Sequence, residues 1–308
     1  MNKKLIALSV AAAFAAPMAA QADSASVSGF ADITLGITDD ANPANEMLFG
    51  ANGEVDFVKT VGAVTARVDV DLFLDPANSA GANIEQALFA WGLTDTVTFI
   101  GGVFNNPIGQ EAEDAPDKNF TSSSMVYRAL DNQTVLDGNN IAGVAVAANL
   151  GVATVTVAAL NDIQHAPEEN SVAFVVNSSP VAGLDLELGY VTQATGVENV
   201  LDINASYAIQ GATIGFDYLV PDELLDSVFD VWAGYDFGNN FGAKVRYSAC
   251  SDAASGATCN AVFGEESSTT LYGSYQAAEN LLVSVEWRSG DNGTDTSDTL
   301  GAEFIATF

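Results

Sequence analysis

Four carboxylates fall within one short stretch, about a third of the way along the chain. Gathered on one segment, they would create a negative potential that attracts cations. If other parts of the chain enclose this segment, the carboxylates would form the acidic side of an internal constriction. If the segment lies outside, they belong to a solvated surface. The four residues are Glu111, Glu113, Asp114 and Asp117.

Four bases could face those acids, because they lie on the polar side of segments in which polar and apolar residues alternate. Acids opposite bases across an enclosed, wet space would set up a transverse field that orders polar solutes. Lys118 and Arg128 lie in the same segment as the acids and could pair with them instead. The four bases are Arg67, Lys244, Arg246 and Arg288.

The sequence offers little for catalysis or for metal chemistry. His165 is its only histidine, and no nucleophile and base accompany it, so we expect an exposed loop residue. One histidine and two cysteines cannot build a transition-metal cluster. The stretch 291–298 carries oxygen ligands that suit calcium, but it lacks the EF-hand spacing, which favours a solvated turn. We therefore predict neither an enzyme nor a bound cofactor.

The two cysteines, Cys250 and Cys259, are nine positions apart. This pair predicts a single disulfide, formed in an oxidising compartment, that closes a flexible exposed loop. A redox-active pair would favour C-x-x-C spacing and a lowered thiol pKa.

The first 22 residues have the pattern of a secretory signal peptide. Lys3 and Lys4 precede an apolar run, Leu5–Ala16, and an A-x-A site ends at Ala22. The apolar run is too short to cross a bilayer as a helix. We predict cleavage after Ala22, which leaves residues 23–308 as one domain.

The predicted mature chain is acidic and yet rich in apolar residues. Seven bases stand against forty acids, a net charge of −33, which makes nucleic acid an implausible partner. The whole chain is 48% hydrophobic, with a mean hydropathy of +0.20. No stretch approaches 18 consecutive apolar residues, so a membrane-spanning helix is not expected. The apolar residues must be spread over short segments.

Sixteen segments show the two-residue alternation of β-strands. In one of them, Val64 and Val68 lie on one face, and Arg67 and Asp69 on the other. Charged residues keep to the polar phase, with Glu85 and Lys59 as the exceptions. The segments are Ala25–Ile37, Met47–Val58, Ala63–Leu74, Ile84–Leu93, Val97–Phe104, Ile141–Leu150, Val152–Leu160, Val172–Asn177, Leu184–Thr192, Val200–Ile209, Ala212–Val220, Val228–Phe237, Asn240–Ser248, Thr269–Gln276, Leu281–Arg288 and Thr299–Phe308.

Three features favour a membrane barrel over a soluble sandwich, which also alternates. Connections alternate between short and long, as periplasmic turns and outer loops do. Aromatic residues of the apolar phase gather toward both ends of the segments. The last segment alternates up to a terminal Phe308. We predict an all-β fold, a closed antiparallel transmembrane β-barrel of 16 strands. A barrel with another even strand count and a soluble all-β fold are the alternatives.

The longest connection, Asn105–Asn140, is the third outer one and contains the four clustered acids. It shows no sustained two-residue or 3.6-residue apolar period. Connections of this length are usually functional or disordered. We expect this one to fold into the lumen and narrow it.

The segment Gly102-Val103-Phe104-Asn105-Asn106-Pro107-Ile108-Gly109-Gln110-Glu111, with the acids and serines that follow, resembles the OmpL-like porins of Gram-negative bacteria. Those carry a G-x-F-x-x-P-x-G-x-E segment after an early strand. The chain also resembles the general diffusion porins, whose long third loop bends into the lumen. A terminal phenylalanine looks like the signal read by outer-membrane assembly machinery. The resemblance implies passive solute transport.

These observations predict an outer-membrane porin with a water-filled channel for small hydrophilic solutes and ions. The net charge predicts a preference for cations. A substrate-selective channel and a non-conducting structural or adhesive barrel stay open as alternatives. Outer-membrane lipid and lipopolysaccharide are the expected surroundings. The small residues of 141–159 fit either a plain lipid-facing wall or the interface of a homotrimer.

Overall fold

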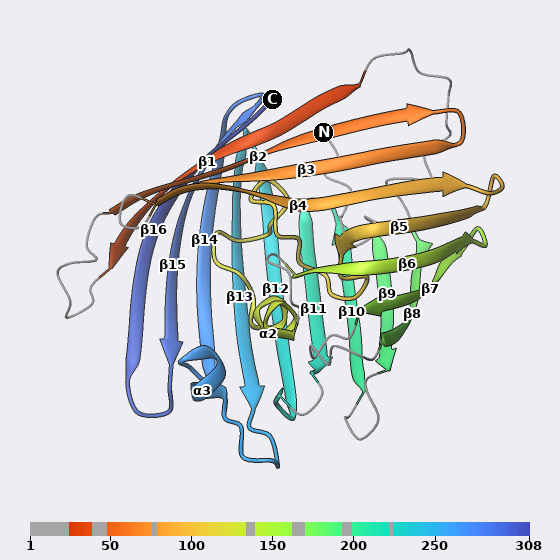
Figure 1. Cartoon of the computed structure of the whole chain (residues 1–308). Coiled ribbons are helices and arrows are strands. Elements are labelled where there is room, and N and C mark those ends of the chain that lie inside the picture. Colours follow the sequence, from red (N-terminus) through yellow and green to blue (C-terminus); the bar gives the residue numbers. More distant parts are fainter. Residues whose placement is uncertain are drawn as a thin grey trace.

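The computed structural model describes residues 25–38, 48–75, 79–133, 139–161, 170–192, 199–221 and 224–308. Their strands are antiparallel and close into one barrel of sixteen, in which β1 pairs with β16 (Figure 1). The predicted fold class is confirmed. The strands are β1 Ser26–Thr38, β2 Leu48–Val61, β3 Val64–Asp75, β4 Ser79–Gly92, β5 Val97–Asn105, β6 Asn140–Asn149, β7 Ala153–Asn161, β8 Asn170–Val181, β9 Leu184–Thr192, β10 Val200–Ile209, β11 Ala212–Val220, β12 Ser227–Gly238, β13 Phe241–Ser251, β14 Ser267–Ala278, β15 Leu281–Asp291 and β16 Thr296–Thr307.

Each strand pairs with its neighbours in the chain, so the order around the barrel is the order of the sequence. Seven connections lie at one end and have at most four residues each. Six of the eight at the other end are longer, as predicted. The β3–β4 and β15–β16 connections have only three and four residues, because these strands continue into residues expected to be loop. The short β8–β9 turn ends at Gly183, whose φ is 84°. A Cβ there would lie 2.2 Å from the carbonyl oxygen of Ala208, so this turn requires glycine. Among the described residues, no helix is long and apolar enough to cross a membrane.

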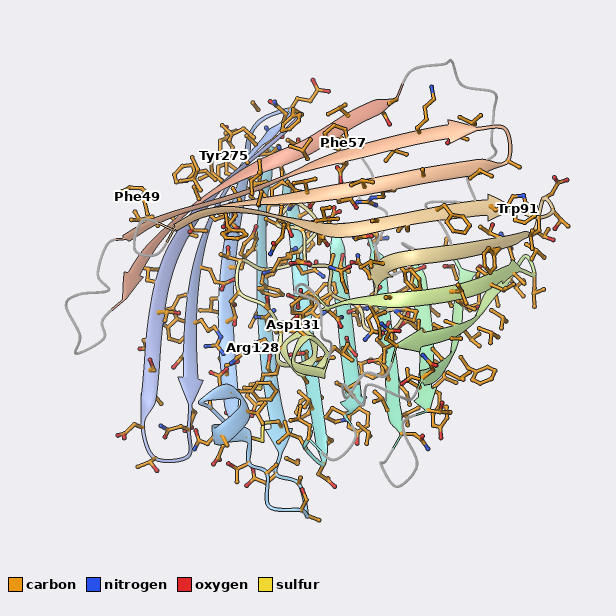
Figure 2. All side chains as sticks on the ribbon, in the orientation of Figure 1. Phe49, Phe57, Trp91, Arg128, Asp131 and Tyr275 are labelled. Carbon is orange, nitrogen blue, oxygen red and sulfur yellow. A yellow bond between two sulfur atoms is a disulfide. The ribbon has the colours of Figure 1, made fainter. Side chains whose placement is uncertain are left out.

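The outer surface of the barrel carries the apolar phase of the strands. Val64 and Val68, predicted to face outward, are 39% and 37% exposed. Large aromatic side chains project from the wall toward both of its ends, as Figure 2 shows for Phe49, Phe57 and Trp91. Such an apolar surface with aromatic residues at its borders suits a barrel surrounded by lipid.

A β-bulge interrupts the pairing of β3 with β4. Asp69 pairs with Gln86 and Val70 pairs with Ile84, so Glu85 is the extra residue. Glu85 and Gln86 are consequently both buried in the barrel, although they are adjacent in sequence. Bulges turn side chains in this way. This bulge explains why Glu85 departs from the alternation of its strand.

The connection from β5 to β6 folds back inside the barrel; we call its residues 106–139 loop 3. It contains the helix α2, Met125–Gln133, which lies within the barrel in Figure 1. The backbone N–H of Tyr127 donates to the Ser124 hydroxyl, which caps the helix. The sequence indicated no regular structure here. The signal for a helix was a short one: Met125, Val126, Ala129 and Leu130 follow helical spacing.

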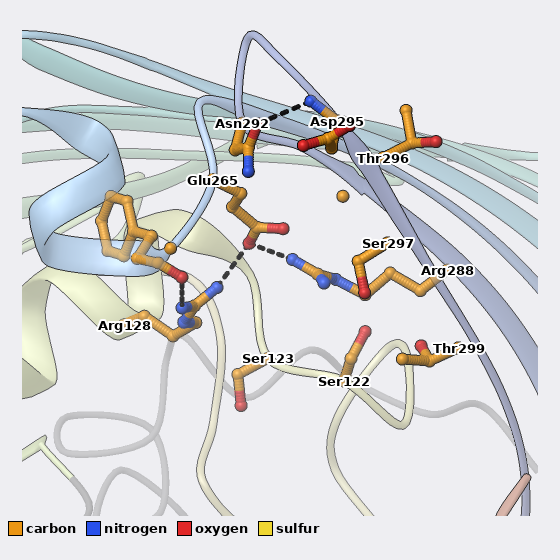
Figure 3. A pocket seen from close by; sticks show the side chains of 13 residues that line it. Ser122, Ser123, Arg128, Glu265, Arg288, Asn292, Asp295, Thr296, Ser297 and Thr299 are labelled. Atoms are coloured by element: carbon orange, nitrogen blue, oxygen red, sulfur yellow. Dashed lines mark hydrogen bonds and ion pairs between the residues drawn. The ribbon is translucent and has the colours of Figure 1, made fainter. Parts of the chain in front are cut away.

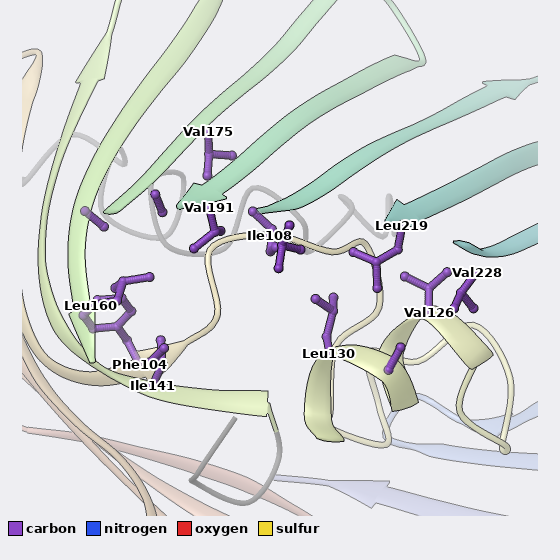
Figure 4. Packing of buried hydrophobic residues seen from close by; sticks show 14 of the residues in the cluster. Phe104, Ile108, Val126, Leu130, Ile141, Leu160, Val175, Val191, Leu219 and Val228 are labelled. Carbon is purple, nitrogen blue, oxygen red and sulfur yellow. The ribbon is translucent and has the colours of Figure 1, made fainter. Parts of the chain in front are cut away.

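The barrel interior is not uniformly polar, although the alternation of the strands predicted polar side chains on the inner face. Ile108 of loop 3 and the apolar face of α2 pack on aliphatic side chains of the inner wall (Figure 4). Gly189 of β9 makes room for this contact, since a Cβ there would lie 2.3 Å from Cγ2 of Ile108. Burying these groups stabilises the seat of loop 3. The aliphatic wall residues include Leu160, Val175, Val191, Leu219 and Val228.

Candidate pore constriction

Carboxylates of the barrel wall hold the backbone of loop 3. The N–H of Gly109 donates to Glu187 Oε1 at 3.1 Å, and that of Gln110 donates to Asp217 Oδ2 at 3.2 Å. The N–H of Val126 donates to Asp230 Oδ2 at 2.9 Å. Hydrogen bonds to a charged acceptor are among the stronger ones. These wall acids, on β9, β11 and β12, fix the first turn of α2 and the segment before it.

The other side of loop 3 is held by β15 and β16. The N–H groups of Thr121 and Ser122 donate to the two carboxylate oxygens of Glu286, at 2.9 and 3.0 Å. The Thr121 hydroxyl donates to Glu303 Oε2 at 2.7 Å. Loop 3 therefore reaches from β9 to β16 and crosses the barrel interior. The alternation placed Glu187, Asp217, Glu286 and Glu303 in the lumen, but it gave no signal that they would bind a loop.

Two of the four predicted wall bases also hold loop 3. Lys244 Nζ donates to the carbonyl oxygen of Asn119 at 2.8 Å and to its Oδ1 at 3.0 Å. Arg246 donates to the carbonyl oxygens of Ser122 and Ser123, at 2.9 and 3.2 Å. Arg246 also lies over the ring of Phe120, 4.6 Å from its centroid.

Glu111 is the predicted loop acid that meets a predicted wall base. Its Oε2 lies 3.6 Å from Nη1 of Arg246, and it accepts the N–H of Ser124 at 2.9 Å. Burial raises the pKa of the Glu111 carboxyl above its usual range, although Arg246 and Lys118 act in the opposite direction. The contact joins loop 3 to β13 and fixes the start of α2.

Glu113 and Asp114 face an acidic part of the wall instead of a row of bases. Burial, followed by the negative charge of Glu85, raises the pKa of Glu113. Burial and the charge of Glu85 also raise the pKa of Asp114 to about 6, while a hydrogen bond with Glu54 and the positive charge of Arg67 act to lower it. Loop acids thus meet wall acids here, and Arg67 is the predicted wall base that acts on them as well.

The remaining predicted residues are placed differently from the expectation. Arg67 pairs with acids of its own wall, at 2.5 Å from Asp69 and 3.2 Å from Asp56. Asp117 is exposed, and its backbone N–H closes a turn onto the carbonyl oxygen of Asp114. Arg288 pairs with Glu265, which belongs to neither group of predicted residues.

Residues 252–266, between β13 and β14, form a second anchor that we call loop 7. The structure joins Cys250 and Cys259 by a disulfide at the base of this loop, and α3, Cys259–Phe263, follows. Glu265 then accepts from Arg128 of α2 at 2.6 Å and from Arg288 of β15 (Figure 3). The sequence allowed Arg128 to pair with acids of its own segment; its partner is instead in loop 7.

A cavity of about 620 Å³ opens beside these contacts (Figure 3). Hydroxyl groups of loop 3 and β16 line it, together with Asn292 and Asp295 of the β15–β16 turn and with Arg128 and Arg288. In that turn, Asp291 and Asn292 accept backbone N–H groups of Gly293 and Thr294, at 2.8 and 2.9 Å. The oxygens that the sequence offered to calcium at 291–298 thus serve the turn itself.

Some predictions fall on parts of the chain that the structure does not describe. His165 and the predicted signal peptide, residues 1–22, lie outside the described residues. Within the described residues, the eight predicted residues are therefore scattered. Glu111 pairs with Arg246, and Arg288 pairs with Glu265. Glu113 and Asp114 lie near Glu85, Arg67 pairs with acids of its own wall, Lys244 binds Asn119, and Asp117 is exposed.

The barrel and its internal loop can be compared with solved structures. An engineered variant of the Rhodopseudomonas blastica porin superposes with a TM-score of 0.63 at 17% identity, over 92% of this chain and 100% of that one. A triple variant of that porin gives 0.64 at 17% identity, with the same coverage. The barrel has the porin fold. A structure described as "Asymmetric conductivity of engineered proteins" gives 0.64 at 16% identity, again over 92% and 100%.

The porin fold rests on these superpositions, because no family model and no curated protein sequence matches the chain. The porin part of the predicted resemblance is confirmed at the level of the fold. The narrower resemblance to the OmpL-like porins stays a prediction.

Proposed function

We propose that this chain forms a water-filled channel in a bacterial outer membrane, through which small hydrophilic solutes and ions diffuse. The observation that carries the proposal is loop 3, which is bound inside a closed barrel by wall acids on β9, β11, β12, β15 and β16. A loop held in this way narrows the lumen at mid-height. Solutes would then be sorted by size at the constriction.

The proposed channel prefers cations. The net charge of the full chain is −31, and the acids of the strands keep to the lumen-facing phase. Negative charge along a narrow passage raises the local concentration of cations. Single-channel recordings on refolded protein in a planar bilayer, with reversal potentials under a KCl gradient, test both claims. Absence of conductance would contradict the channel, and an anion preference would contradict the selectivity.

A substrate-selective channel is the second candidate, and the cavity beside Glu265 favours it. Its hydroxyl groups and its two arginines, Arg128 and Arg288, could contact a passing polar solute. A selective channel would show saturable current blockade by one class of solute. A general channel would show no such blockade, and its permeability to uncharged solutes would depend on their size alone.

The cellular setting belongs to the same proposal. We infer that residues 1–22 direct export and are removed, and that residues 23–308 reside in the outer membrane of a Gram-negative bacterium, in contact with lipid and lipopolysaccharide. The small residues of 141–159 would suit a homotrimer interface. Mass spectrometry of the protein purified from outer membranes would give its first residue and its oligomeric state.

A further inference from the structure

Two overlapping groups of carboxylates lie on the inner wall formed by β2, β3 and β4. In the first, Glu54, Asp56 and Asp69 place one oxygen each within 4.8 Å of one another; in the second, Glu54, Asp71 and Glu85 do so. The two groups share Glu54 and therefore adjoin.

An arginine already pairs with the first group. The Arg67 guanidinium lies 2.5 Å from Asp69, 3.2 Å from Asp56 and 3.9 Å from Glu54. In the second group, Glu54 reaches this guanidinium only at that longest distance. Within the described residues, no ion pair is formed by Glu85 with a lysine or arginine.

Burial raises the free energy of the negatively charged second group when no cation lies beside it. Glu54 is 2% exposed and Glu85 is 5% exposed. In the part of the chain that the structure describes, the Oε2 atom of each accepts no hydrogen bond from an amide, a hydroxyl or a cationic group. The polar neighbours of these side chains include further carboxyls, Asp114 beside Glu54 and Glu113 beside Glu85. A buried carboxylate oxygen normally has a donor or a metal ion beside it. Both side chains belong to one group whose oxygens converge, so a bound cation would serve both.

The β-bulge is what completes this group. It turns Glu85 into the barrel next to Gln86, whereas regular alternation would place Glu85 on the outer surface. Asn140, at the return of loop 3 into β6, donates to Glu85 Oε1 at 3.1 Å and to Glu113 of loop 3 at 3.4 Å. The amide thereby fixes the orientation of Glu85 and keeps loop 3 beside the group. Bulges commonly serve to aim a side chain at a site.

We propose that Glu54, Asp71 and Glu85 form a binding site for a calcium ion on the inner wall, beside loop 3. All three ligands are carboxylates, the hard oxygen donors that Ca²⁺ prefers, and there is no histidine or thiolate among them that would favour a transition metal. Ca²⁺ accepts irregular arrangements of six to eight oxygens, so water would complete its shell. The test of this site is independent of the proposed function, because Ca²⁺ binding can be measured whether or not the channel conducts.

The site can be tested by titrating the refolded protein with Ca²⁺ in detergent micelles. Isothermal titration calorimetry at physiological ionic strength measures the binding. The expected result is saturable binding of one Ca²⁺ per chain, with weaker binding of Mg²⁺. Glu85→Gln and Asp71→Asn keep the size of each side chain and remove one charge. Each should weaken Ca²⁺ binding by at least about tenfold. Loss of a residue that only hydrogen-bonds to a metal ligand already weakens metal binding by about ten- to a hundredfold.

Asp56→Asn is the matched control, because it removes one acid that pairs with Arg67 in the neighbouring group. Its Ca²⁺ affinity should equal that of the wild type. Equal losses in all three variants would mean diffuse attraction by the acidic lumen and would overturn the proposal, as would the lack of saturable binding by the wild type. The heat-dependent gel mobility of each variant verifies that its barrel has folded.

Discussion

Glu111 gives loop 3 a charge that depends on pH. Its pKa is raised by burial, so the carboxyl takes up a proton at a higher pH than free glutamate, whose pKa is about 4.3. As the pH falls from neutral, the charge on Glu111 is therefore lost before the ordinary glutamate range is reached. Arg246 then remains as an uncompensated positive charge beside the constriction.

Glu111→Gln should show this titration as a difference from the wild type. At a pH where Glu111 is ionised, the variant lacks one negative charge and should prefer cations less, as measured by reversal potentials in a KCl gradient. As the pH is lowered, the two proteins should converge, and they should coincide while the pH is still above about 4.3. Convergence only below that value would contradict a raised pKa.

At the scale of elements, loop 3 is seated by a close approach between Ile108 and Gly189. Gly189→Ala would place a Cβ 2.3 Å from Cγ2 of Ile108, so loop 3 must move away from β9. Overpacking of this kind costs about 1–3 kcal/mol. Chemical unfolding in lipid vesicles should show this loss. Because Ile108→Ala removes the clashing group, the double variant should recover much of it; purely additive losses would show that the two residues do not interact.

Loop 7 acts on α2 through Glu265, so its own order should affect α2. The disulfide limits the conformations of loop 7, and Glu265 pairs with Arg128 at 2.6 Å. Reduction should therefore speed amide hydrogen exchange in both α3 and α2, while the strands stay protected. Mass spectrometry of peptic fragments would measure this. The Cys250→Ser, Cys259→Ser double variant should behave in the same way without reductant; a change confined to α3 would argue against the coupling.

On the scale of the whole molecule, the barrel does not depend on loop 3 for its closure. β5 and β6 pair as far as Asn105 and Asn140, where a short turn could join them. Replacing residues 106–139 by Asn-Gly should therefore leave a closed barrel of lower stability, because the aliphatic inner wall loses its cover. Its single-channel conductance should rise, because the constriction is gone. A folded variant with unchanged conductance would show that loop 3 does not limit the passage.

The strands could be predicted from the sequence because their pattern is local. A pleated strand alternates its side chains by geometry, and a chain with lipid outside and polar groups inside must repeat that alternation in every strand. Leu184–Thr192, Val200–Ile209 and Ala212–Val220 accordingly begin and end where the pattern does. Most of the order of long and short connections followed for the same reason, except at β3–β4 and β15–β16, where the strands run on and leave short turns.

The interior was decided by the tertiary structure. Gly109 meets Glu187, 78 positions away, and Thr121 meets Glu286, 165 positions away, and no local pattern encodes such pairs. The inward turn of Glu85 likewise depends on its register with β3. The sequence by itself determined a closed barrel and where the long loop leaves it. Only the folded wall, with its hydrogen-bond acceptors and its apolar seat, determined where that loop binds and which charges it meets.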